Sequence, residues 1–486
     1  MSYLELLKLA SPEATVVATA LVVLSVGLMI RRPAAPCIAV AALGLALAAG
    51  AVALLPRQAT LLGGMLVISP LTSLFKIVCM GLALFTVLLT TWEKRPRHAG
   101  EYLAMILLAT VGLMLLVGSE NLLMIFIGLE LLGLSLYVMA AFDKSDIRSA
   151  EAGLKYFLFG SVSSAFTLFG ISLIYGIAGT TALAAISEKL AAAAGQPLLG
   201  IGIVMTLVGF AFKIAAAPFH LWAPDAYQGA PVPSAAFIAS ASKVASFLVL
   251  GKIVLVGFAS VRGSAAWHGA TAGWSPLVAA LAAASIVVGN LAALVQSNVR
   301  RLLAYSAVAH GGYALIGLVP GSRDGFSAAL FYITVYAVTL IGAFGVVGLV
   351  RRQSGGDDLS NFSGLRARSP ILASCMAVFL LSLAGIPPLA GFFGKFYLFS
   401  AALRGRADQN LLWLVAVALF GSFISLYYYL IVLKAIFVEA ASPSNAVARA
   451  RRDFAAAMVI SLLAALVLLL GIYPGVLTAR ILAALS

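Results

Sequence analysis

The sequence predicts an all-α integral membrane protein with about 14 transmembrane helices. Of its 486 residues, 63% are hydrophobic and only 10% are charged, whereas about a quarter of the residues in soluble domains are charged. The apolar segments are repeatedly about 20 residues long, which is the length that a helix needs to cross a hydrocarbon core of ~30 Å. No alternating ten-residue pattern of a membrane β-barrel is seen in the sequence.

Fourteen apolar segments follow one another, and no cleavable signal peptide precedes them, because the first begins after Glu5, Lys8 and Glu13 and continues into the next. Their approximate cores are residues 14–30, 36–55, 71–92, 102–118, 121–141, 154–178, 199–222, 233–258, 276–296, 302–319, 327–350, 370–403, 411–435 and 454–477.

The distribution of lysine and arginine predicts the orientation, since basic residues favour cytoplasmic loops. If even-numbered spans run outward, sixteen basic residues are cytoplasmic: Arg31, Arg32, Lys94, Arg95, Arg97, Lys144, Arg148, Arg300, Arg301, Arg351, Arg352, Arg366, Arg368, Arg449, Arg451 and Arg452. Eight are on the outer side: Lys8, Arg57, Lys189, Arg262, Arg323, Arg404, Arg406 and Arg480. Both termini are therefore predicted on the outer, periplasmic side. This asymmetry also accounts for the net charge of +14 without a nucleic-acid partner.

The cysteines and histidines argue against a bound cofactor or metal. Cys37, Cys79 and Cys375 lie far apart in apolar segments, without the spacing of an iron–sulfur cluster, a zinc site or a c-type haem attachment. The four histidines are equally scattered, and no nucleotide-binding motif is present. We expect no cofactor in this chain.

Two spans are predicted to be discontinuous. The seventh reaches Pro218 and is followed by Pro224, and the twelfth contains Pro387 and Pro388. Proline removes a backbone donor and clashes with the preceding turn. Broken backbone at membrane depth persists only where it is buried in protein or lines a watery cavity.

The two breaks are five spans apart, which predicts two inverted five-helix repeats within one membrane domain, 1–486. Paired broken segments at corresponding positions are a sequence signature of a transport site. The expected parts are three N-terminal helices (1–95), a first repeat (101–258, spans 4–8), a second repeat (275–435, spans 9–13) and a C-terminal helix (454–486).

Four ionisable residues lie well inside apolar spans: Glu130, Lys213, Lys243 and Lys395. A bare charge at the bilayer centre costs about 2.5–3.5 kcal/mol on insertion scales. Burial can bring the pKa of a lysine from about 10.4 toward neutrality, and a nearby carboxylate opposes that shift. A Glu130–Lys213 pair that forms and breaks would act as a proton switch. The alternative is that these charges are structural ion pairs.

His310 lies inside the tenth span and is a candidate relay, because histidine titrates near neutral pH. Small residues flank it and leave space for water, which Tyr305 and Tyr313 could order. The alternative for a lone intramembrane histidine is that it is only hydrogen-bonded to a helix neighbour.

Four further residues are possible relays. Lys155 has Glu151 four residues earlier, which also fits a simple helix-surface pair. Lys252 is either an exit-side relay or an anchor that extends to the membrane interface. His220 and Asp225 follow the seventh-span break. They either close the loop, with Asp225 capping free backbone donors, or shape a cytoplasmic entrance.

Two motifs resemble those of a known family. Residues 213–233, Lys-Ile-Ala-Ala-Ala-Pro-Phe-His-Leu-Trp-Ala-Pro-Asp-Ala-Tyr-Gln-Gly-Ala-Pro-Val-Pro, and residues 385–399, Gly-Ile-Pro-Pro-Leu-Ala-Gly-Phe-Phe-Gly-Lys-Phe-Tyr-Leu-Phe, are similar to motifs of antiporter-like membrane subunits. These subunits occur in the proton-pumping NADH:quinone oxidoreductase (respiratory complex I) and in multisubunit cation/proton antiporters. The resemblance runs across most of the chain.

The resemblance implies fourteen helices, two inverted repeats and roles for the buried charges. Glu130 matches the fifth-helix glutamate and Lys213 the seventh-helix lysine with which it pairs. Lys243 matches the central connecting lysine of the eighth helix, and Lys395 the terminal lysine of the twelfth.

Within the family, the N-type branch fits best. M-type members usually have glutamate at the position of Lys395, and L-type members have a long lateral helix after the fourteenth span, whereas this sequence ends nine residues after Leu477. Residues 156–161 also look N-like. The Ala- and Arg-rich composition suggests a bacterial source, and hence the bacterial inner membrane.

The resemblance thus implies a proton-translocating subunit that does no redox chemistry itself. NADH, FMN, iron–sulfur clusters and quinone would be bound by partner subunits. The expected partners are an M-type neighbour, small K-type and J-type subunits, and lipids. Two alternatives remain open: a subunit of a sodium/proton antiporter, and an inert membrane scaffold.

Overall fold

The computed structural model describes residues 3–91, 98–193, 195–404, 410–440 and 454–485. Seven basic residues that entered the charge count lie outside these ranges: Lys94, Arg95, Arg97, Arg406, Arg449, Arg451 and Arg452.

The N-terminal part consists of helices joined by one small hairpin. Its elements are α1 (Tyr3–Leu9), α2 (Ser11–Met29), α3 (Ala34–Leu54), β1 (Ala59–Leu61), η1 (Leu62–Gly64), β2 (Leu66–Ile68) and α4 (Pro70–Leu89). Strands β1 and β2 pair antiparallel, with Thr60 opposite Val67.

The middle of the chain contains the first broken span. Its elements are α5 (Ala99–Gly118), α6 (Leu122–Ala140), α7 (Ile147–Ala178), α8 (Leu183–Leu190), η2 (Ala191–Ala193), α9 (Pro197–Lys213), α10 (Ala223–Gly229), α11 (Val232–Ala239), α12 (Ala241–Lys252), the π-helical turn η3 (Ile253–Gly257) and η4 (Ala259–Val261).

The C-terminal part contains the second broken span. Its elements are α13 (Trp274–Leu294), α14 (Val299–Ile316), α15 (Arg323–Ser354), α16 (Leu359–Phe362), α17 (Leu365–Arg368), α18 (Pro370–Ala384), α19 (Ala390–Leu403), α20 (Leu412–Phe437), α22 (Phe454–Ile472) and α23 (Gly475–Leu485).

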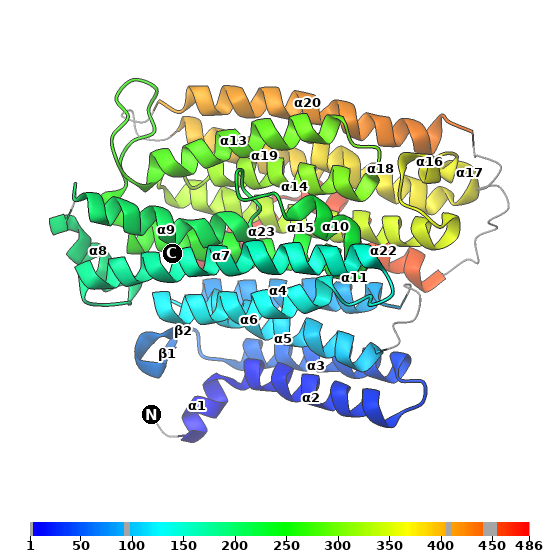
Figure 1. The fold of residues 1–486 in the computed structure, drawn as a ribbon, viewed down its shortest axis with the longest axis horizontal. Helices are drawn as coiled ribbons and strands as arrows, with labels where there is room; N and C mark the ends of the chain where they lie inside the picture. The colour runs from blue at the N-terminus through cyan, green and yellow to red at the C-terminus, as the bar shows by residue number, and fades with distance from the viewer. Residues whose placement is uncertain (1–2, 92–97, 194, 405–409, 441–453, 486) are drawn as a thin grey trace.

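The prediction of an all-α, multi-pass membrane protein is confirmed. Within the described residues, eleven helices are long and apolar enough to cross a membrane. The three other predicted spans correspond to α9, α14 and the α18–α19 pair. The long helices run side by side along one axis, and both termini lie toward the same end of them (Figure 1). The count of 14 and the division into repeats stay predictions.

Local sequence signals explain where several helices begin and end. Before α4, Ser69 and Thr72 form a capping box, and Pro70 occupies the first turn, where its missing N–H costs nothing. Helix α6 begins after Asn121, whose side chain accepts from the N–H groups of Leu123 and Met124. Helix α7 ends at Ala178 and is followed by Gly179 in the left-handed conformation (φ 67°), which glycine adopts without steric cost.

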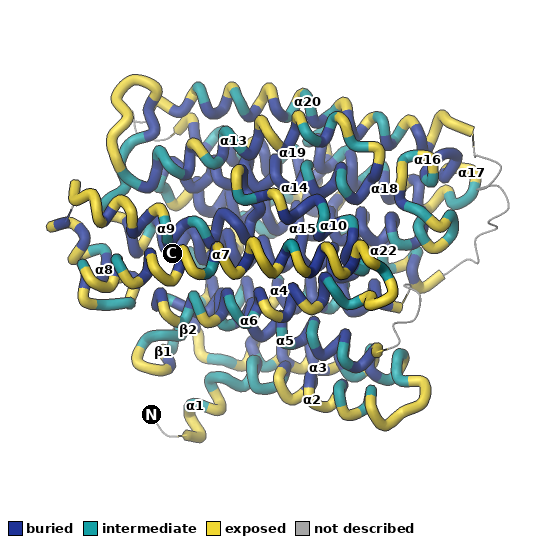
Figure 2. Tube along the Cα trace, in the orientation of Figure 1, coloured by how far each residue is buried: buried dark blue, intermediate teal, exposed yellow. Residues whose placement is uncertain are grey.

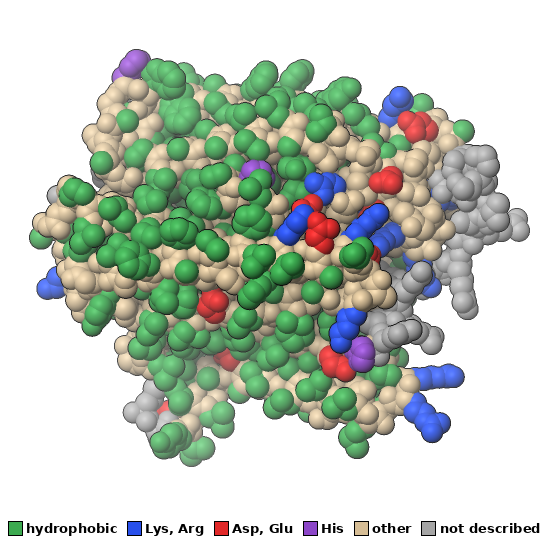
Figure 3. Space-filling model, viewed as in Figure 1, with side chains coloured by type: hydrophobic (Ala, Val, Ile, Leu, Met, Phe, Trp, Pro, Cys, Tyr) green, Lys and Arg blue, Asp and Glu red, His purple; other side chains and the backbone are tan. Residues whose placement is uncertain are grey.

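The buried centre of the bundle is formed by α11, α12 and α15, whose residues are almost all buried. In Figure 2, α2 and α20 lie along opposite edges of the bundle and α7 crosses the side facing the viewer, and all three have many exposed positions. Large apolar side chains such as Phe166, Phe420 and Phe423 are exposed there, as expected of a face that meets lipid or a partner subunit. Figure 3 shows hydrophobic side chains over most of this face, with acidic and basic side chains gathered toward one half.

Both predicted breaks are present. Helix α9 ends at Lys213, and residues 214–222 are not helical. The freed backbone groups find partners: Trp222 Nε1 donates to the carbonyl of Phe212 (3.1 Å), and Ser285 Oγ accepts from the N–H of Ala217 (2.9 Å). The second break separates α18 from α19 at residues 385–389 and begins at Gly385, with φ 87°.

Candidate functional site

Glu130 on α6 and Lys213 at the end of α9 line the same small cavity, with Ser164 of α7 on its wall. The cavity has a volume of about 10 Å³, which is close to the space that one water molecule needs. Ser164 Oγ donates a hydrogen bond to Glu130 Oε1, and Glu130 is half-buried. The two predicted partners therefore face a common space, but no ion pair joins them among the described residues.

The ammonium group of Lys213 is surrounded by aromatic rings. Its Nζ lies 5.1 Å from the ring centre of Tyr137 and 5.7 Å from that of Tyr156, and it has no hydrogen-bond partner among the described residues. Gly133 leaves room for it, since a Cβ there would lie 2.8 Å from Nζ. Lys213 is thus a buried cation held by cation–π contacts beside a space for water.

Lys243 on α12 is fully buried and reaches across to α14. Its Nζ donates to the carbonyl of Ala307 (2.6 Å) and lies 5.5 Å from the ring centre of Tyr336. That ring in turn lies 5.0 Å from the ring of His310. Lys243 and His310 are therefore separated by a single aromatic side chain.

His310 is the centre of a tyrosine network. Its Nδ1 is 2.6 Å from the hydroxyl of Tyr332, and its Nε2 is 3.1 Å from that of Tyr429. The Tyr429 hydroxyl also bonds to Ser306. Both ring nitrogens are engaged by side chains of the neighbouring helices α15 and α20, an arrangement that fits a relay and equally fits the alternative of a histidine that is only hydrogen-bonded to a helix neighbour.

Lys395 on α19 lies at the second break. Its Nζ donates to the carbonyl of Ala384 (3.0 Å), at the end of α18, and to Ser422 Oγ of α20 (2.9 Å). It also lies 5.0 Å from the ring centre of Tyr313. A cation at the carboxyl end of a helix is favoured by the helix dipole and by the free carbonyls there.

Tyr313 connects the last two groups. Its ring is edge-on to His310, at 5.7 Å, and its hydroxyl accepts from Asn290 Nδ2 (3.1 Å). Tyr305 lies elsewhere, with its ring 6.4 Å from that of buried His220. Of the two tyrosines considered for ordering water near His310, Tyr313 contacts the histidine ring, whereas Tyr305 lies beside His220 at the first break.

Asp225 on α10 joins two helices at one end of the bundle. Its carboxylate binds Lys155 Nζ of α7 (2.6 Å) and Arg301 Nη1 of α14 (2.6 Å). Burial raises the pKa of Asp225, but the hydrogen bonds from Lys155 and Arg301 outweigh it and hold the pKa below its usual range. Among the described residues the Asp225 carboxylate accepts hydrogen bonds from Lys155 and Arg301 and from no backbone N–H, so the structure does not bear out the capping role considered for it. The predicted Glu151–Lys155 pair is confirmed, at 2.5 Å.

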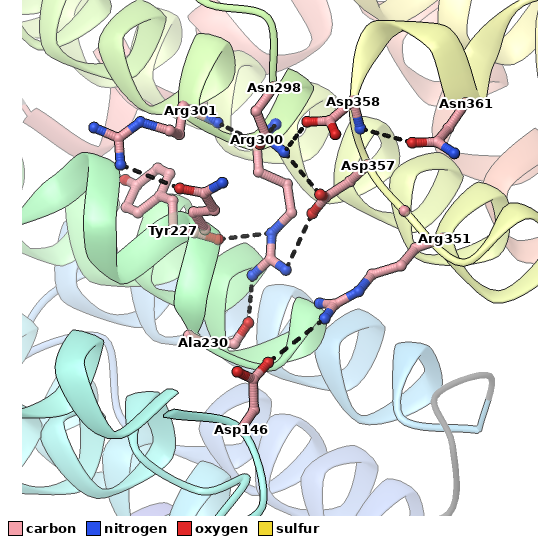
Figure 4. A network of polar contacts seen from close by, with 12 residues as sticks. Asp146, Tyr227, Ala230, Asn298, Arg300, Arg301, Arg351, Asp357, Asp358 and Asn361 are labelled. Carbon is pink, nitrogen blue, oxygen red and sulfur yellow. Dashed lines mark hydrogen bonds and ion pairs between the residues drawn. The ribbon is translucent and has the colours of Figure 1, made fainter. Parts of the chain in front are cut away.

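Arg300 corrects the sequence analysis, which placed it in a cytoplasmic loop. It lies in the first turn of α14 and is fully buried. Its Nε donates to the carbonyl of Tyr227 (2.7 Å), its Nη2 to that of Ala230, and its Nη1 lies 3.4 Å from Asp357 Oδ2 (Figure 4). The reason for the error is that Asp357, which follows α15, folds back over the start of α14.

The same network holds several loops together. Asn298 Nδ2 donates to Asp357 Oδ1 (2.7 Å) and to Asp358 Oδ1 (2.9 Å), while Arg351 lies 3.9 Å from Asp146 (Figure 4). The whole network thus joins the segment after the first break to the start of α14 and to the end of α15.

Lys252 lies at the other end of α12 from the first break. Its side chain is 6% exposed, and its Nζ donates to the carbonyl of Val117 (3.1 Å) and lies 3.6 Å from Glu120, whose side chain is 45% exposed. Lys252 is therefore buried against a carboxylate that reaches the surface, rather than extended as an anchor.

Sequence reasoning missed the residues that connect the lysines: Tyr137, Tyr156, Ser164, Tyr332, Tyr336, Ser422 and Tyr429. A weak signal exists, because Tyr332 and Tyr336 are four residues apart within an apolar span and so share a helix face. Tyrosine is common at the ends of spans, and this alone does not mark a site.

Fold and site together define a polytopic helical membrane protein whose broken helices place buried cations in its interior. Residues 119–425 match the family model described as NADH:quinone oxidoreductase/Mrp antiporter, transmembrane. The chain is 47% identical to NADH-quinone oxidoreductase subunit N 2 of Acidobacterium capsulatum, over 98% of both chains. It is 39% identical to NADH-quinone oxidoreductase subunit N of Moorella thermoacetica, over 97% of both. The chain belongs to the NADH:quinone oxidoreductase/Mrp antiporter family, and the predicted resemblance to its N-type branch is confirmed.

Chains of solved membrane complexes have the same fold as this chain. A chain of respiratory complex I from Thermus thermophilus with bound Aureothin superimposes with a TM-score of 0.78 at 32% identity, covering 96% of this chain and 98% of that one. A chain of the Mrp complex from Dietzia sp. has a TM-score of 0.81 at 22% identity, covering 100% and 97%. The second likeness shows the shared fold alone.

Proposed function

We propose that this chain moves protons across the membrane through a buried row formed by Glu130, Lys213, Lys243, His310 and Lys395. The observation that supports the proposal most directly is the continuity of the part of this row from Lys243 to Lys395. From Lys243 through Tyr336, His310 and Tyr313 to Lys395, successive groups are in ring or cation–π contact. A water-sized cavity adjoins Glu130 and Lys213 at the other end of the row.

The required energy is of the right size for this machinery. Moving one charge against about 200 mV costs ~4.6 kcal/mol. Breaking one buried ion pair costs about 3–5 kcal/mol. A Lys213 ammonium that approaches and leaves Glu130 across the cavity between them would therefore supply or absorb the energy of one translocation step.

Two groups of charged residues, one beside the first break and one at the far end of α12, are candidate access points to the row. Asp225, Lys155 and Arg301 form a partly exposed ion-pair cluster next to the first break, and this cluster would be the cytoplasmic entrance, near His220. At the opposite end of α12, Lys252 and Glu120 would form an exit-side relay.

In this proposal the chain is a translocase subunit without redox chemistry or a cofactor of its own. NADH, FMN, iron–sulfur clusters and quinone would be held by other subunits of an NADH:quinone oxidoreductase, and quinone reduction would drive the charge movements. An M-type antiporter-like subunit and small K-type and J-type subunits would be its neighbours. It would lie in a bacterial inner membrane, with both termini on the periplasmic side.

A double replacement distinguishes a proton carrier from a scaffold. Replacing Glu130 and Lys213 together, E130L with K213M, keeps the volume and removes both charges, which a structural site tolerates. In the whole complex reconstituted in proteoliposomes, we expect NADH-driven proton uptake to be lost while assembly persists. Lys434→Met, at an exposed lysine of α20, is the matched control. Normal proton uptake in the double variant would reject the proposal.

The sodium/proton antiporter function is the second candidate. Relatives named NADH-quinone oxidoreductase subunit N at 38–47% identity favour the first function. NADH-driven proton uptake in sodium-free vesicles is expected; a strict requirement for sodium moving in the opposite direction would favour the second. Neighbouring genes for flavin- and cluster-binding proteins would also favour the first.

A further inference from the structure

A large cavity opens at the end of the bundle opposite the Arg300 network. Its volume is about 860 Å³, within the roughly 300–1,000 Å³ of small-molecule sites. It lies between the turns that follow α12, the start of α15, the end of α19 and the helix α23. None of the residues in the proposed proton row lines it.

The charge around this cavity is unusual for its side of the membrane. Arg262 and Arg404 line it, and Asp324 is the one acidic residue among its described lining residues. Arg323, next to Asp324, donates to the carbonyl of the lining residue Leu482 (2.6 Å). Four of the eight basic residues predicted on the outer side belong to the described segments around the cavity: Arg262, Arg323, Arg404 and Arg480. Basic residues are disfavoured on that side, so their gathering here indicates an anionic ligand.

The other walls indicate an amphiphile. The hydroxyls of Ser260, Ser327 and Ser400 share the cavity with the apolar surfaces of Leu255 and Trp274. The absence of a side chain at Gly321 leaves room for Arg262, since a Cβ on residue 321 would lie 2.6 Å from the arginine Nε. A ligand with a charged, hydrogen-bonding head and an apolar body fits both kinds of wall.

We propose that this cavity binds an anionic membrane phospholipid, with its phosphodiester held by Arg262 and Arg404. Guanidinium groups bind phosphate oxygens in bidentate geometry. Asp324 disfavours a dianion such as free phosphate but accepts hydrogen bonds from a polyol headgroup. The apolar wall would cover the start of the acyl chains. This site is independent of the proposed proton row.

Binding is tested on the intact complex, purified and delipidated in detergent. Phosphatidylglycerol in mixed micelles is titrated, with phosphatidylethanolamine and inorganic phosphate as separate arms, and bound lipid is counted by native mass spectrometry. We expect saturable phosphatidylglycerol binding that Arg262→Gln with Arg404→Gln weakens at least about tenfold, as expected for lost charge-assisted hydrogen bonds. Arg57→Gln, an exposed arginine on the same predicted side but outside the cavity, should bind as the parent does.

If the complex with the double replacement fails to assemble, a second variant still tests the proposal. Ser400→Phe fills the cavity and keeps both arginines, and it should exclude phosphatidylglycerol to a similar extent. Equal binding by the parent, the double variant and Ser400→Phe would overturn the proposal. So would equal affinity for phosphatidylethanolamine, or displacement of the lipid by millimolar inorganic phosphate.

Discussion

Arg300 and Lys213 are both buried cations, but the structure treats them in opposite ways. The guanidinium of Arg300 is engaged by two backbone carbonyls and by Asp357 (Figure 4). The ammonium of Lys213 has aromatic rings and a water-sized cavity around it and no hydrogen-bond partner among the described residues. One cation is fixed in place, whereas the other is left able to change partners.

Under the proposed function, the difference separates a charge that is buried to stabilise the fold from one that is buried to exchange protons. Removing a charged group from water costs several kcal/mol, and hydrogen bonds and ion pairs must offset this cost. Around Arg300 they do so, and the result is a rigid connection between the first break and the ends of α14 and α15. Around Lys213 the offset is incomplete, which is the condition for a group that exchanges protons. Lys395, with two hydrogen bonds, lies between these extremes.

The largest effect is expected from breaking the fixed cation. Arg300→Met leaves the carbonyls of Tyr227 and Ala230 without the arginine donor and removes the cation that faces Asp357, which keeps, within the described residues, only its hydrogen bond from Asn298. The free energy of unfolding should therefore fall by about 3–5 kcal/mol. Thermal unfolding of the purified complex and its abundance in membranes measure this loss. Arg351→Met, at a partly exposed pair 3.9 Å long, should cost less than about 1 kcal/mol. Equal stability of the two variants would show that the Arg300 network is not structural.

Breaking the other cation should change function and spare stability. Lys213→Met removes no hydrogen bond to any residue that the structure describes, so the free energy of unfolding should stay within about 1 kcal/mol of the parent. Proton uptake should fall at least about tenfold, because a positioned proton carrier is lost. Proton uptake per NADH oxidised and thermal unfolding are measured together. A stability loss as large as that of Arg300→Met would place Lys213 among the structural cations.

A smaller change, Gly133→Ala, tests the difference between Lys213 and Arg300 without removing either charge. In Gly133→Ala the new Cβ would lie 2.8 Å from Lys213 Nζ and 3.2 Å from Tyr137 Oη. The flexible end of the lysine can move aside, so proton uptake should fall a few-fold with little change in thermal stability.

The matched control for Gly133→Ala is Gly421→Ala in the second half of the chain. There the new Cβ would meet Ile286, Asn290 and Tyr313 at 2.5–2.9 Å, and crowding of packed side chains should cost about 1–3 kcal/mol. If both variants lose stability alike, the space beside Lys213 is ordinary packing.

The sequence was sufficient for some of these features and not for others, for physical reasons. Lys213, Lys243 and Lys395 could be found because a charge inside an apolar span is costly and therefore conspicuous. The two breaks could be found because proline cannot continue a helix. Tyr332, Tyr336 and Tyr429 could not be selected, because an aromatic hydroxyl is compatible with lipid, core and interface alike.

Arg300 shows a second limit. At the end of an apolar span, the pattern of basic residues indicates only which side of the membrane is nearby. Its burial depends on Asp357, which is distant along the chain and reaches Arg300 only through the fold. Contacts between residues far apart in the sequence decide whether a charged residue at the end of a span is exposed to water or buried. The local sequence pattern carries no information about such contacts.

The smallest expected effect concerns the ion pairs of Asp225, which are partly exposed and so contribute less than about 1 kcal/mol each. The pKa of Asp225 is lowered in the folded protein by Lys155 and Arg301, against the opposing effect of burial. Its stabilising contribution is therefore complete above the unfolded-state value of about 3.9 and is lost as the pH falls through the lowered pKa. The difference in melting temperature between the parent and Asp225→Asn should stay constant from pH 8 to pH 5 and shrink only below about pH 4.

Glu151→Gln removes the more exposed partner of Lys155 and should give a smaller difference in melting temperature at neutral pH. A difference between the parent and Asp225→Asn that varies between pH 6 and pH 8 would contradict the assignment. It would mean that another titrating group controls this cluster. A constant difference means that the Asp225 cluster keeps one charge state throughout the working pH range. Any pH dependence of proton uptake in that range must then arise from other groups, and the buried row around Lys213 is the first place to look for it.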